Sequence, residues 1–208
     1  MKRCVIMGGA PIGDTAAAVS ALRNDDYLIC CDSGLRHLNI LGRQPDLIIG
    51  DFDSHPRPDT DVETIVLPTV KDDTDTAYAV KESLRRGFED FLLLGVVGKR
   101  LDHTWANVCL LLYLDTLGKR AIILDDYSEL SVVSRDAAEV TADYPFFSLL
   151  NVDGQADGIT VTGAKYPLEG ASIGCEYQYG VSNEVLPGMT ARITVGKGRL
   201  LLVKIRHE

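Results

Sequence analysis

The sequence predicts two domains: an α/β domain with a mostly parallel, doubly wound sheet over residues 1–128, and an all-β sandwich over residues 129–208. Three observations support this fold class. As far as residue 124, short apolar runs alternate with segments of helical periodicity, which is typical of parallel sheets covered by helices. Acidic residues follow several of these runs. After about residue 130, glycines separate short alternating segments, which is typical of antiparallel β-structure.

In the first domain, the apolar runs are expected to form buried strands at residues 4–7, 27–31, 47–49, 64–67, 91–94 and 121–124. Helices are expected at residues 15–22, at residues 35–41 with an end at Gly42, and onward from about residues 75 and 102. In the last of these helices, the spacing places Trp105, Val108 and Leu112 on one face, which we expect to be buried.

In the second domain, strands are expected at residues 130–133, 146–152, 158–162, 190–195 and 200–205. Gly196-Lys197-Gly198 lies between the last two and is typical of a hairpin turn. These two strands are therefore expected to pair with each other.

The composition limits the classes of partner. The chain has 208 residues, 46% of them hydrophobic, and a net charge of -9, so it lacks the basic surface that nucleic acid requires. No apolar run approaches membrane-spanning length, and Gly8 and Gly9 interrupt the first one, so we expect neither a membrane partner nor a signal peptide. The five cysteines show no CxxC spacing, which favours free thiols and a cytoplasmic location.

Carboxylates recur just past the ends of the predicted strands. The most prominent set is Gly50-Asp51-Phe52-Asp53-Ser54, and Asp32, residues 72–75 and Asp102 occupy similar places. Because the carboxyl ends of parallel strands share one edge of the sheet, these side chains are expected to converge. Carboxylate oxygens suit Mg²⁺, so the pattern favours metal-assisted phosphate chemistry. The alternative is that these are turn and helix-capping residues, which would not require several acidic clusters at one edge.

Basic residues lie among these acids. Lys71 precedes the acidic segment 72–75, and Lys99 and Arg100 precede Asp102. Both residue types bind phosphate through charge and hydrogen bonds, so these side chains are candidates for contacts to a nucleotide. His103 follows as a candidate base, although a histidine in a first helical turn is more often structural.

A different nucleotide site is indicated near the N-terminus. Gly8-x-Ala10-x-x-Gly13 follows the first strand and Asp32 ends the second, which nearly matches the dinucleotide-binding fingerprint. The central glycine of that fingerprint is missing and Pro11 interrupts it. This hypothesis also leaves the later carboxylates unexplained, so it ranks below metal-assisted phosphate chemistry.

Five short motifs occur along the chain in a definite order. They are Cys31-Asp32-Ser33-Gly34, Pro45-Asp46 with residues 50–54, Lys71-Asp72-x-Thr74-Asp75, Gly98-Lys99-Arg100-x-Asp102-His103 with Asn107, and Ser182-Asn183-Glu184. Together they resemble the motifs of the thiamine pyrophosphokinases. The resemblance implies Mg²⁺-dependent transfer of diphosphate from ATP to thiamine, giving thiamine diphosphate and AMP. It also implies a nucleotide-binding α/β domain, a β-sandwich that binds thiamine and mediates dimerisation, and a homodimer with its active site between the subunits.

The same resemblance implies roles for the matching residues. The catalytic set would be Asp51, Asp53, Asp72, Thr74 and Asp75, of which Asp51, Asp53 and Asp75 would hold Mg²⁺. The nucleotide would contact Asp32, Lys71, Lys99, Arg100, Asp102 and Asn107. Thiamine would contact Tyr166, Ser182 and Asn183, with Tyr166 stacking on its ring. The general base stays unassigned.

The chain departs from the family pattern at two positions. Lys99 stands where the family has a second glycine, and it would be strained if that position required a positive φ. Ser33 follows Asp32 where glycine is usual. Two other functions stay open at this point: a diphosphokinase for another hydroxymethyl heterocycle such as a pterin, and a non-catalytic nucleotide-binding module.

Overall fold

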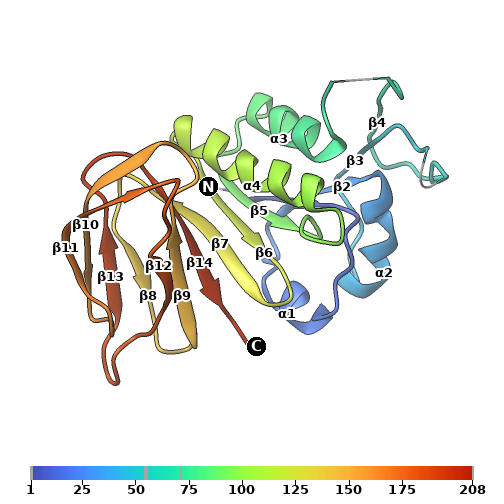
Figure 1. Ribbon diagram of the computed structural model, residues 1–208. Helices are drawn as coiled ribbons and strands as arrows, with labels where there is room; N and C mark the ends of the chain where they lie inside the picture. The colour runs from blue at the N-terminus through green and yellow to red at the C-terminus, as the bar shows by residue number, and fades with distance from the viewer. Residues whose placement is uncertain (1, 54–55, 71, 208) are drawn as a thin grey trace. The chain divides into compact units, whose positions relative to one another are not determined.

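The structure is a computed structural model that describes residues 2–53, 56–70 and 72–207. The chain divides into two compact units, Met1–Asp126 and Tyr127–Glu208 (Figure 1). The first unit combines helices and strands. The described part of the second contains strands and no helix, so the predicted order of an α/β part followed by an all-β part is confirmed. In the part of the chain that the structure describes, none of the helices combines the length and the hydrophobicity that a membrane-spanning helix needs.

Six parallel strands form the sheet of the first unit, in the order β6-β5-β1-β2-β3-β4. They are β1 (Cys4–Met7), β2 (Tyr27–Cys31), β3 (Leu47–Gly50), β4 (Thr64–Val66), β5 (Asp90–Leu94) and β6 (Arg120–Leu124). β1 lies between β2 and β5, where Met7 pairs with Cys30 and with Leu94. Because the strands are parallel, their carboxyl ends share one edge, which carries the glycine-rich loop, Asp32 and Asp51.

Helical segments connect these strands. They are α1 (Thr15–Ser20), the 3₁₀ helix η1 (Asp32–His37), α2 (Leu38–Leu41), α3 (Asp75–Arg85) and α4 (Leu101–Thr116). The helix expected at residues 35–41 is thus a 3₁₀ helix followed by one α-helical turn. Gly42 ends this turn with a φ of 60°, in the left-handed conformation that glycine adopts readily. α3 and α4 pack against each other and run side by side in Figure 1.

Side chains on both faces of this sheet are buried. Val5 and Met7 point to one face and pack in a cluster with Leu35 of η1 and Leu41 of α2. The alternate residue Cys4 points to the other face, where its Sγ lies 3.2 Å from Ser83 Oγ of α3. Burial on both faces explains why the strands of this unit are continuous apolar runs.

The buried face of α4 differs from the predicted one. Val108 is buried as expected, but Trp105 is 52% exposed and Leu112 is only partly buried. The residues that α4 buries are Asn107, Val108, Leu111 and Leu114. Apolar side chains surround most of this helix, so periodicity alone does not indicate which face packs against the sheet.

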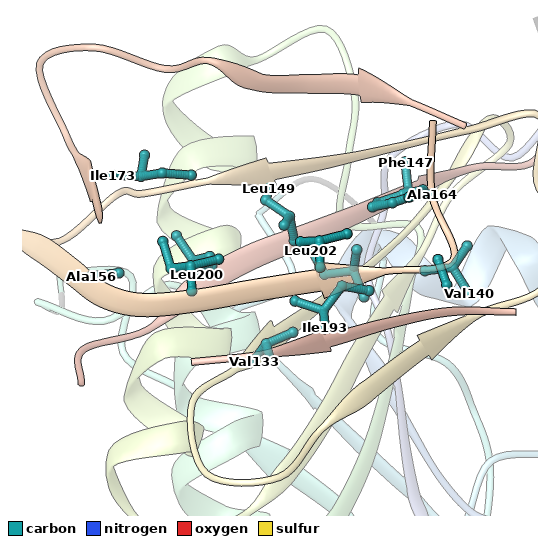
Figure 2. Close-up of a cluster of buried hydrophobic side chains, with 13 residues drawn as sticks. Val133, Val140, Phe147, Leu149, Ala156, Ala164, Ile173, Ile193, Leu200 and Leu202 are labelled. Atoms are coloured by element: carbon teal, nitrogen blue, oxygen red, sulfur yellow. The ribbon is translucent and has the colours of Figure 1, made fainter. Parts of the chain in front are cut away.

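Within the second unit, one antiparallel sheet has the strand order β12-β9-β14-β7 and the other has β11-β10-β13-β8. The strands are β7 (Ser128–Val133), β8 (Ala138–Val140), β9 (Phe146–Leu150), β10 (Gln155–Thr162), β11 (Leu168–Gly174), β12 (Gly180–Asn183), β13 (Ala191–Thr194) and β14 (Leu200–Ile205). Buried side chains from both sheets meet in one apolar core, which Figure 2 shows around Leu202, Leu149 and Ile193.

The predicted hairpin at Gly196-Lys197-Gly198 is wrong. β13 pairs with β10 and β8, whereas β14 pairs with β7 and β9, so the chain passes from one sheet to the other here. The amides of Gly196 and Lys197 donate to the carbonyl of Asp157 in β10 instead. The sequence prediction also missed β8, β11 and β12. β8 has only three residues, and β11 and β12 contain glycine and are largely exposed.

Candidate active site

Three carboxylates converge at the carboxyl edge of the parallel sheet. Asp32 begins η1 directly after β2, Asp51 directly follows β3, and Asp75 is the first residue of α3. Their carboxylate oxygen atoms lie within 4.8 Å of one another. Asp32 is buried and the other two are half-buried. Like charges this close repel each other, and a cation placed among them would relieve the repulsion.

The backbone explains how Asp51 reaches this cluster. A Cβ atom at Gly50 would lie 2.8 Å from the Cβ atom of Asp32, so glycine is required for β2 and β3 to end this close together. Phe52 has a φ of 59°, a left-handed conformation that costs a non-glycine residue about 1–2 kcal/mol. Its side chain packs against the apolar core and anchors the turn. The amide of Asp53 donates to Asp51 Oδ1 at 3.3 Å.

Asp53 is placed differently from the other predicted metal ligands. It lines the same cavity, but its side chain is exposed, and it is not in the group of carboxylates within 4.8 Å of one another. The turn at Phe52 separates Asp53 from Asp51. Among the described residues, the structure therefore brings together Asp51 and Asp75 from the predicted metal set, with Asp32 as the third carboxylate.

A cavity of about 570 Å³ opens beside the cluster, within the range of about 300–1,000 Å³ typical of small-molecule sites. The predicted site residues that line it are Asp32, Asp51, Asp53, Thr74, Asp75, Lys99, Arg100 and Asn107. Asp72 is exposed, and neither Asp72 nor Asp102 is among the lining residues. Lys71, which was predicted to contact the nucleotide, lies outside the described residues.

Arg100, which lines the cavity, forms an ion pair with Asp102. The guanidinium donates to both carboxylate oxygens, at 2.9 Å and 2.5 Å. Hydrogen bonds from Arg100 lower the pKa of Asp102 well below its ordinary value. Arg100 lines the cavity, whereas Asp102 does not. Asp102 therefore contributes indirectly, by orienting the Arg100 side chain.

Two side chains of α4 form hydrogen bonds to the backbone of the loop that precedes this helix. Asn107 is buried and its Nδ2 donates to the carbonyl of Val96 at 2.8 Å. The hydroxyl of Thr104 accepts from the amide of Gly98 at 3.1 Å. A Cβ atom at Gly98 would lie 3.0 Å from the Cβ atom of Ala10, so glycine suits this tightly packed position. The sequence analysis did not single out Thr104, because its signal appears only once the loop is folded back onto the helix.

Both departures from the family pattern are accommodated. Among the described residues, Phe52 and Ser182 are the non-glycine residues with positive φ, so Lys99 carries none of the strain considered above. Its side chain is exposed where it lines the cavity. A Cβ atom at Gly9 would lie 1.7 Å from Ser33 Oγ, so the glycine at position 9 makes room for the serine hydroxyl.

The start of α3 combines capping with the acidic cluster. Thr74 is the N-cap residue, and its hydroxyl accepts from the amide of Ala77 at 3.2 Å. Asp73 pairs with Lys81 at 2.7 Å. Asp75 follows in the first turn, where the helix dipole favours a negative charge. Thr74 thus shapes the site by starting the helix that carries Asp75.

Cys31 and the glycine-rich loop also line the cavity, although the sequence analysis did not include them in the site. Burial raises the pKa of the Cys31 thiol well above its ordinary value. The thiol therefore stays protonated and adds no charge to the acidic cluster.

In the second unit, Asn183 holds the backbone of Tyr166. Its Oδ1 accepts from the amides of Tyr166 and Glu184, at 3.0 Å and 2.9 Å, and its Nδ2 donates to the carbonyl of Tyr166 at 2.9 Å. Asn183 is buried, whereas the Tyr166 side chain is 57% exposed. Ser182, in the left-handed conformation, donates its amide to Ser148 Oγ at 3.1 Å. The structure thus brings Tyr166 and Asn183 together and presents the tyrosine ring to solvent.

Two features define the class of protein: an α/β unit with an acidic cavity at the carboxyl edge of its parallel sheet, and an all-β unit that follows it. Residues 18–123 match the family described as thiamin pyrophosphokinase, catalytic domain. Residues 133–200 match the one described as thiamin pyrophosphokinase, vitamin B1 binding domain. The chain therefore belongs to the thiamin pyrophosphokinase family, and the transferase class inferred from its motifs is confirmed.

Solved structures of this family share the fold. The thiamine pyrophosphokinase of Bacillus subtilis is 21% identical, with a TM-score of 0.87 and 100% of both chains covered. That of Geobacillus thermodenitrificans is 26% identical, with a TM-score of 0.84, covering 100% of this chain and 99% of the other. The yeast enzyme is 12% identical, with a TM-score of 0.70, covering 98% of this chain and 86% of the other. A search of curated proteins found no match.

Proposed function

We propose that this chain transfers the diphosphate group of ATP to the hydroxyl of thiamine, giving thiamine diphosphate and AMP, with Mg²⁺ as the cofactor. The observation that carries this proposal is the convergence of Asp32, Asp51 and Asp75 beside a cavity in a chain of this family. The size of the cavity suits a nucleotide.

The acidic cluster fits Mg²⁺. Three carboxylates supply oxygen atoms within 4.8 Å of one another, which is the donor type that this ion takes. We assign Asp32, Asp51 and Asp75 as the residues that would hold it, with Asp53 close enough along the chain to contact a hydrated ion or the phosphates. When bound, Mg²⁺ neutralises phosphate charge and polarises the phosphoryl oxygens.

The cationic side chains Lys99 and Arg100 line the same cavity. Arg100, oriented by Asp102, would donate to phosphate oxygens in a bidentate manner, and Lys99 would add a point charge. Asn107 and Thr104 hold the loop that presents these cations. The roles that the resemblance implies for Asp72 and Lys71 stay predictions. A nucleotide held by these groups would have its diphosphate positioned for in-line attack by the substrate hydroxyl.

The second unit would supply the thiamine contacts. Its match to a vitamin B1 binding domain supports this assignment, as does the exposed ring of Tyr166. Ser182 and Asn183 are consecutive residues of β12, and Asn183 holds the backbone of Tyr166. We propose that residues 1–128 form the nucleotide domain, with a doubly wound sheet, and that residues 129–208 form a β-sandwich. We further propose a cytoplasmic homodimer whose active site lies between the subunits.

The direct test supplies MgATP and thiamine to the purified chain and follows AMP and thiamine diphosphate by chromatography. Equal amounts of both products are expected, and chelation of the metal should stop their formation. A hydroxymethyl pterin offered in place of thiamine tests the acceptor. Turnover of the pterin but not of thiamine, or no product from folded protein with metal present, would overturn the proposal.

A further inference from the structure

The glycine-rich loop after β1 has no role in the assignments above. In the sequence, residues 8–13 nearly match a dinucleotide fingerprint, whose function depends on backbone amides that are available to phosphate. In the structure, residues 8–11 line the same cavity as the acidic cluster. The loop can bind phosphate only if its backbone amides are free of other partners. The contacts that hold the loop therefore determine its role.

The far end of the loop is occupied by a carboxylate of the same chain. Asp126, which lies just past β6, accepts from the amide of Gly13 through both oxygens, at 2.9 Å and 2.8 Å. It also accepts from the amide of Asp14 at 2.9 Å. These amides are among the donors that a pyrophosphate would use at such a turn. The loop is therefore tied to β6, and Asp126 places a negative charge where a phosphate would otherwise bind.

The near end of the loop is tied to β5. The amide of Gly8 donates to the carbonyl of Leu94, and that of Ala10 donates to the carbonyl of Gly95, both at 2.8 Å. A Cβ atom at Gly8 would lie 2.5 Å from the Gly95 oxygen, so this glycine is required by the close approach of two chain segments.

The middle of the loop is held from behind by a buried histidine. His37, at the end of η1, is 5% exposed, and its Nε2 lies 2.9 Å from the carbonyl oxygen of Ala10. A carbonyl can only accept, so Nε2 carries the hydrogen and donates it. Burial lowers the pKa of His37, which favours the neutral ring. The carbonyl that it binds belongs to a residue that lines the cavity and packs against Gly98.

We propose that the glycine-rich loop is a fixed wall of the nucleotide cavity, that His37 is its positioning residue, and that Asp126 both anchors the loop and excludes phosphate from the Gly13 and Asp14 amides. The inference rests on the proposed function, because it takes a nucleotide to be the ligand of the cavity. The near-match to a dinucleotide fingerprint is then a consequence of tight packing between β1, β5 and η1.

Hydrogen exchange of the loop amides tests the proposal without relying on activity. His37→Leu removes the donor, whereas His37→Gln keeps an N–H group at a similar reach. Exchange at Ala10 and its neighbours is expected to rise about 5–10-fold in His37→Leu, and to return toward the wild-type rate in His37→Gln. Asp126→Ala should accelerate exchange at Gly13 and Asp14, while leaving Ala10 protected. Unchanged exchange in His37→Leu, or equal acceleration in both His37 variants, would overturn the positioning role.

Kinetics and binding give the second arm of the test. The KM for ATP is expected to rise about 5–10-fold in His37→Leu, with the KM for thiamine unchanged and His37→Gln close to wild type. Calorimetry of the wild-type chain with NAD should show no binding. Equal changes in both KM values, or binding of NAD by the wild-type chain, would contradict the proposal. Absence of turnover in the wild-type chain would instead defeat the proposed function, and the exchange data would still decide the role of His37.

Discussion

The acidic cluster of the first unit and the Tyr166–Asn183 pair of the second differ in how their polar groups are arranged. The first brings like charges together, whereas the second pairs hydrogen-bond donors with acceptors. Asp32, Asp51 and Asp75 bring like charges within 4.8 Å, beside a strained backbone at Phe52. Asn183 instead satisfies both backbone groups of Tyr166 with its buried amide. The first arrangement reduces stability and is useful only with a ligand, whereas the second stabilises the fold and presents an aromatic ring. Substitutions should therefore separate activity from stability differently in the two places.

The largest effect is expected in the acidic cluster. Asp51→Asn and Asp75→Asn should each lower kcat by at least about 100-fold, because they remove charge that compensates the metal and the phosphates. The melting temperature should stay the same or rise, since one of three repelling charges is lost. Asp61→Asn, an exposed site in the same unit, is the control and should match the wild type in both measurements. A fall in melting temperature that accompanies the loss of activity would mean that the cluster is structural.

A smaller effect, mainly on stability, is expected at Asn183. Asn183→Ala leaves the amide and the carbonyl of Tyr166 without this partner, which should reduce the free energy of unfolding by about 1–3 kcal/mol. Asn183→Asp can still accept from the amides but cannot donate to the carbonyl, so its stability should be intermediate. Chemical denaturation of the two variants measures this order, and the exposed Asn24→Ala is the control. Equal stability of all three variants would show that the contact to Tyr166 contributes nothing.

Substitution of Tyr166 should weaken the binding of thiamine without changing the stability of the fold. The ring is 57% exposed, so Tyr166→Ala should leave the melting temperature nearly unchanged. Loss of an aromatic contact worth about 0.5–1.5 kcal/mol should raise the KM for thiamine roughly 2–12-fold, with the KM for ATP unchanged. Tyr166→Phe keeps the ring and should behave like the wild type. Steady-state kinetics with each substrate varied in turn distinguishes this result from a general loss of activity.

The smallest effect is expected in the pH dependence of stability, through the carboxylate of Asp26. This group is buried and forms an ion pair with Arg3. Burial raises the pKa of Asp26, but hydrogen bonds from Arg3 and from the Arg23 amide outweigh it, and the pKa lies below the ordinary 3.8. Because the folded pKa is depressed, this stabilisation is complete above the unfolded pKa and is lost as the pH falls through the folded pKa.

Unfolding measured between pH 7 and pH 3 checks this contribution of Asp26. Asp26→Asn should be less stable at neutral pH, and it should lose less stability than the wild type on acidification. Asp25→Asn, at the exposed neighbouring position, should follow the wild-type curve. Parallel curves for the wild type and Asp26→Asn would contradict the assignment of the pKa shift.

The convergence of the carboxylates could be predicted from the sequence because it follows from topology. Asp32 and Asp51 each come directly after a buried apolar run, and parallel strands place such residues at one edge. The choice of Asp32 over Asp53 as the third carboxylate of the cluster could not be predicted. It depends on the left-handed turn at Phe52, whose partly buried side chain packs against the core.

Two other features depend on the partners that the fold supplies. The exposed face of α4 at Trp105 was mispredicted because apolar residues surround the helix, and only the position of the sheet decides which of them are buried. The turn at Gly196 was taken for a hairpin because turn residues specify a change of direction but not the strand that receives the chain. β14 pairs with β7 and β9, which lie far from it in the sequence.

The sequence by itself determined the order of an α/β part and an all-β part, the family, and the set of acidic and basic residues at the ends of the strands. These follow from local periodicity and from motifs, which the chain carries in consecutive residues. The tertiary structure alone decided which carboxylates lie close together. It also decided that Asn183 hydrogen-bonds to the backbone of Tyr166, and that Asp126 accepts hydrogen bonds from the amides of Gly13 and Asp14. Each of these depends on distances between residues far apart in the chain, which are set only when the strands and helices pack together.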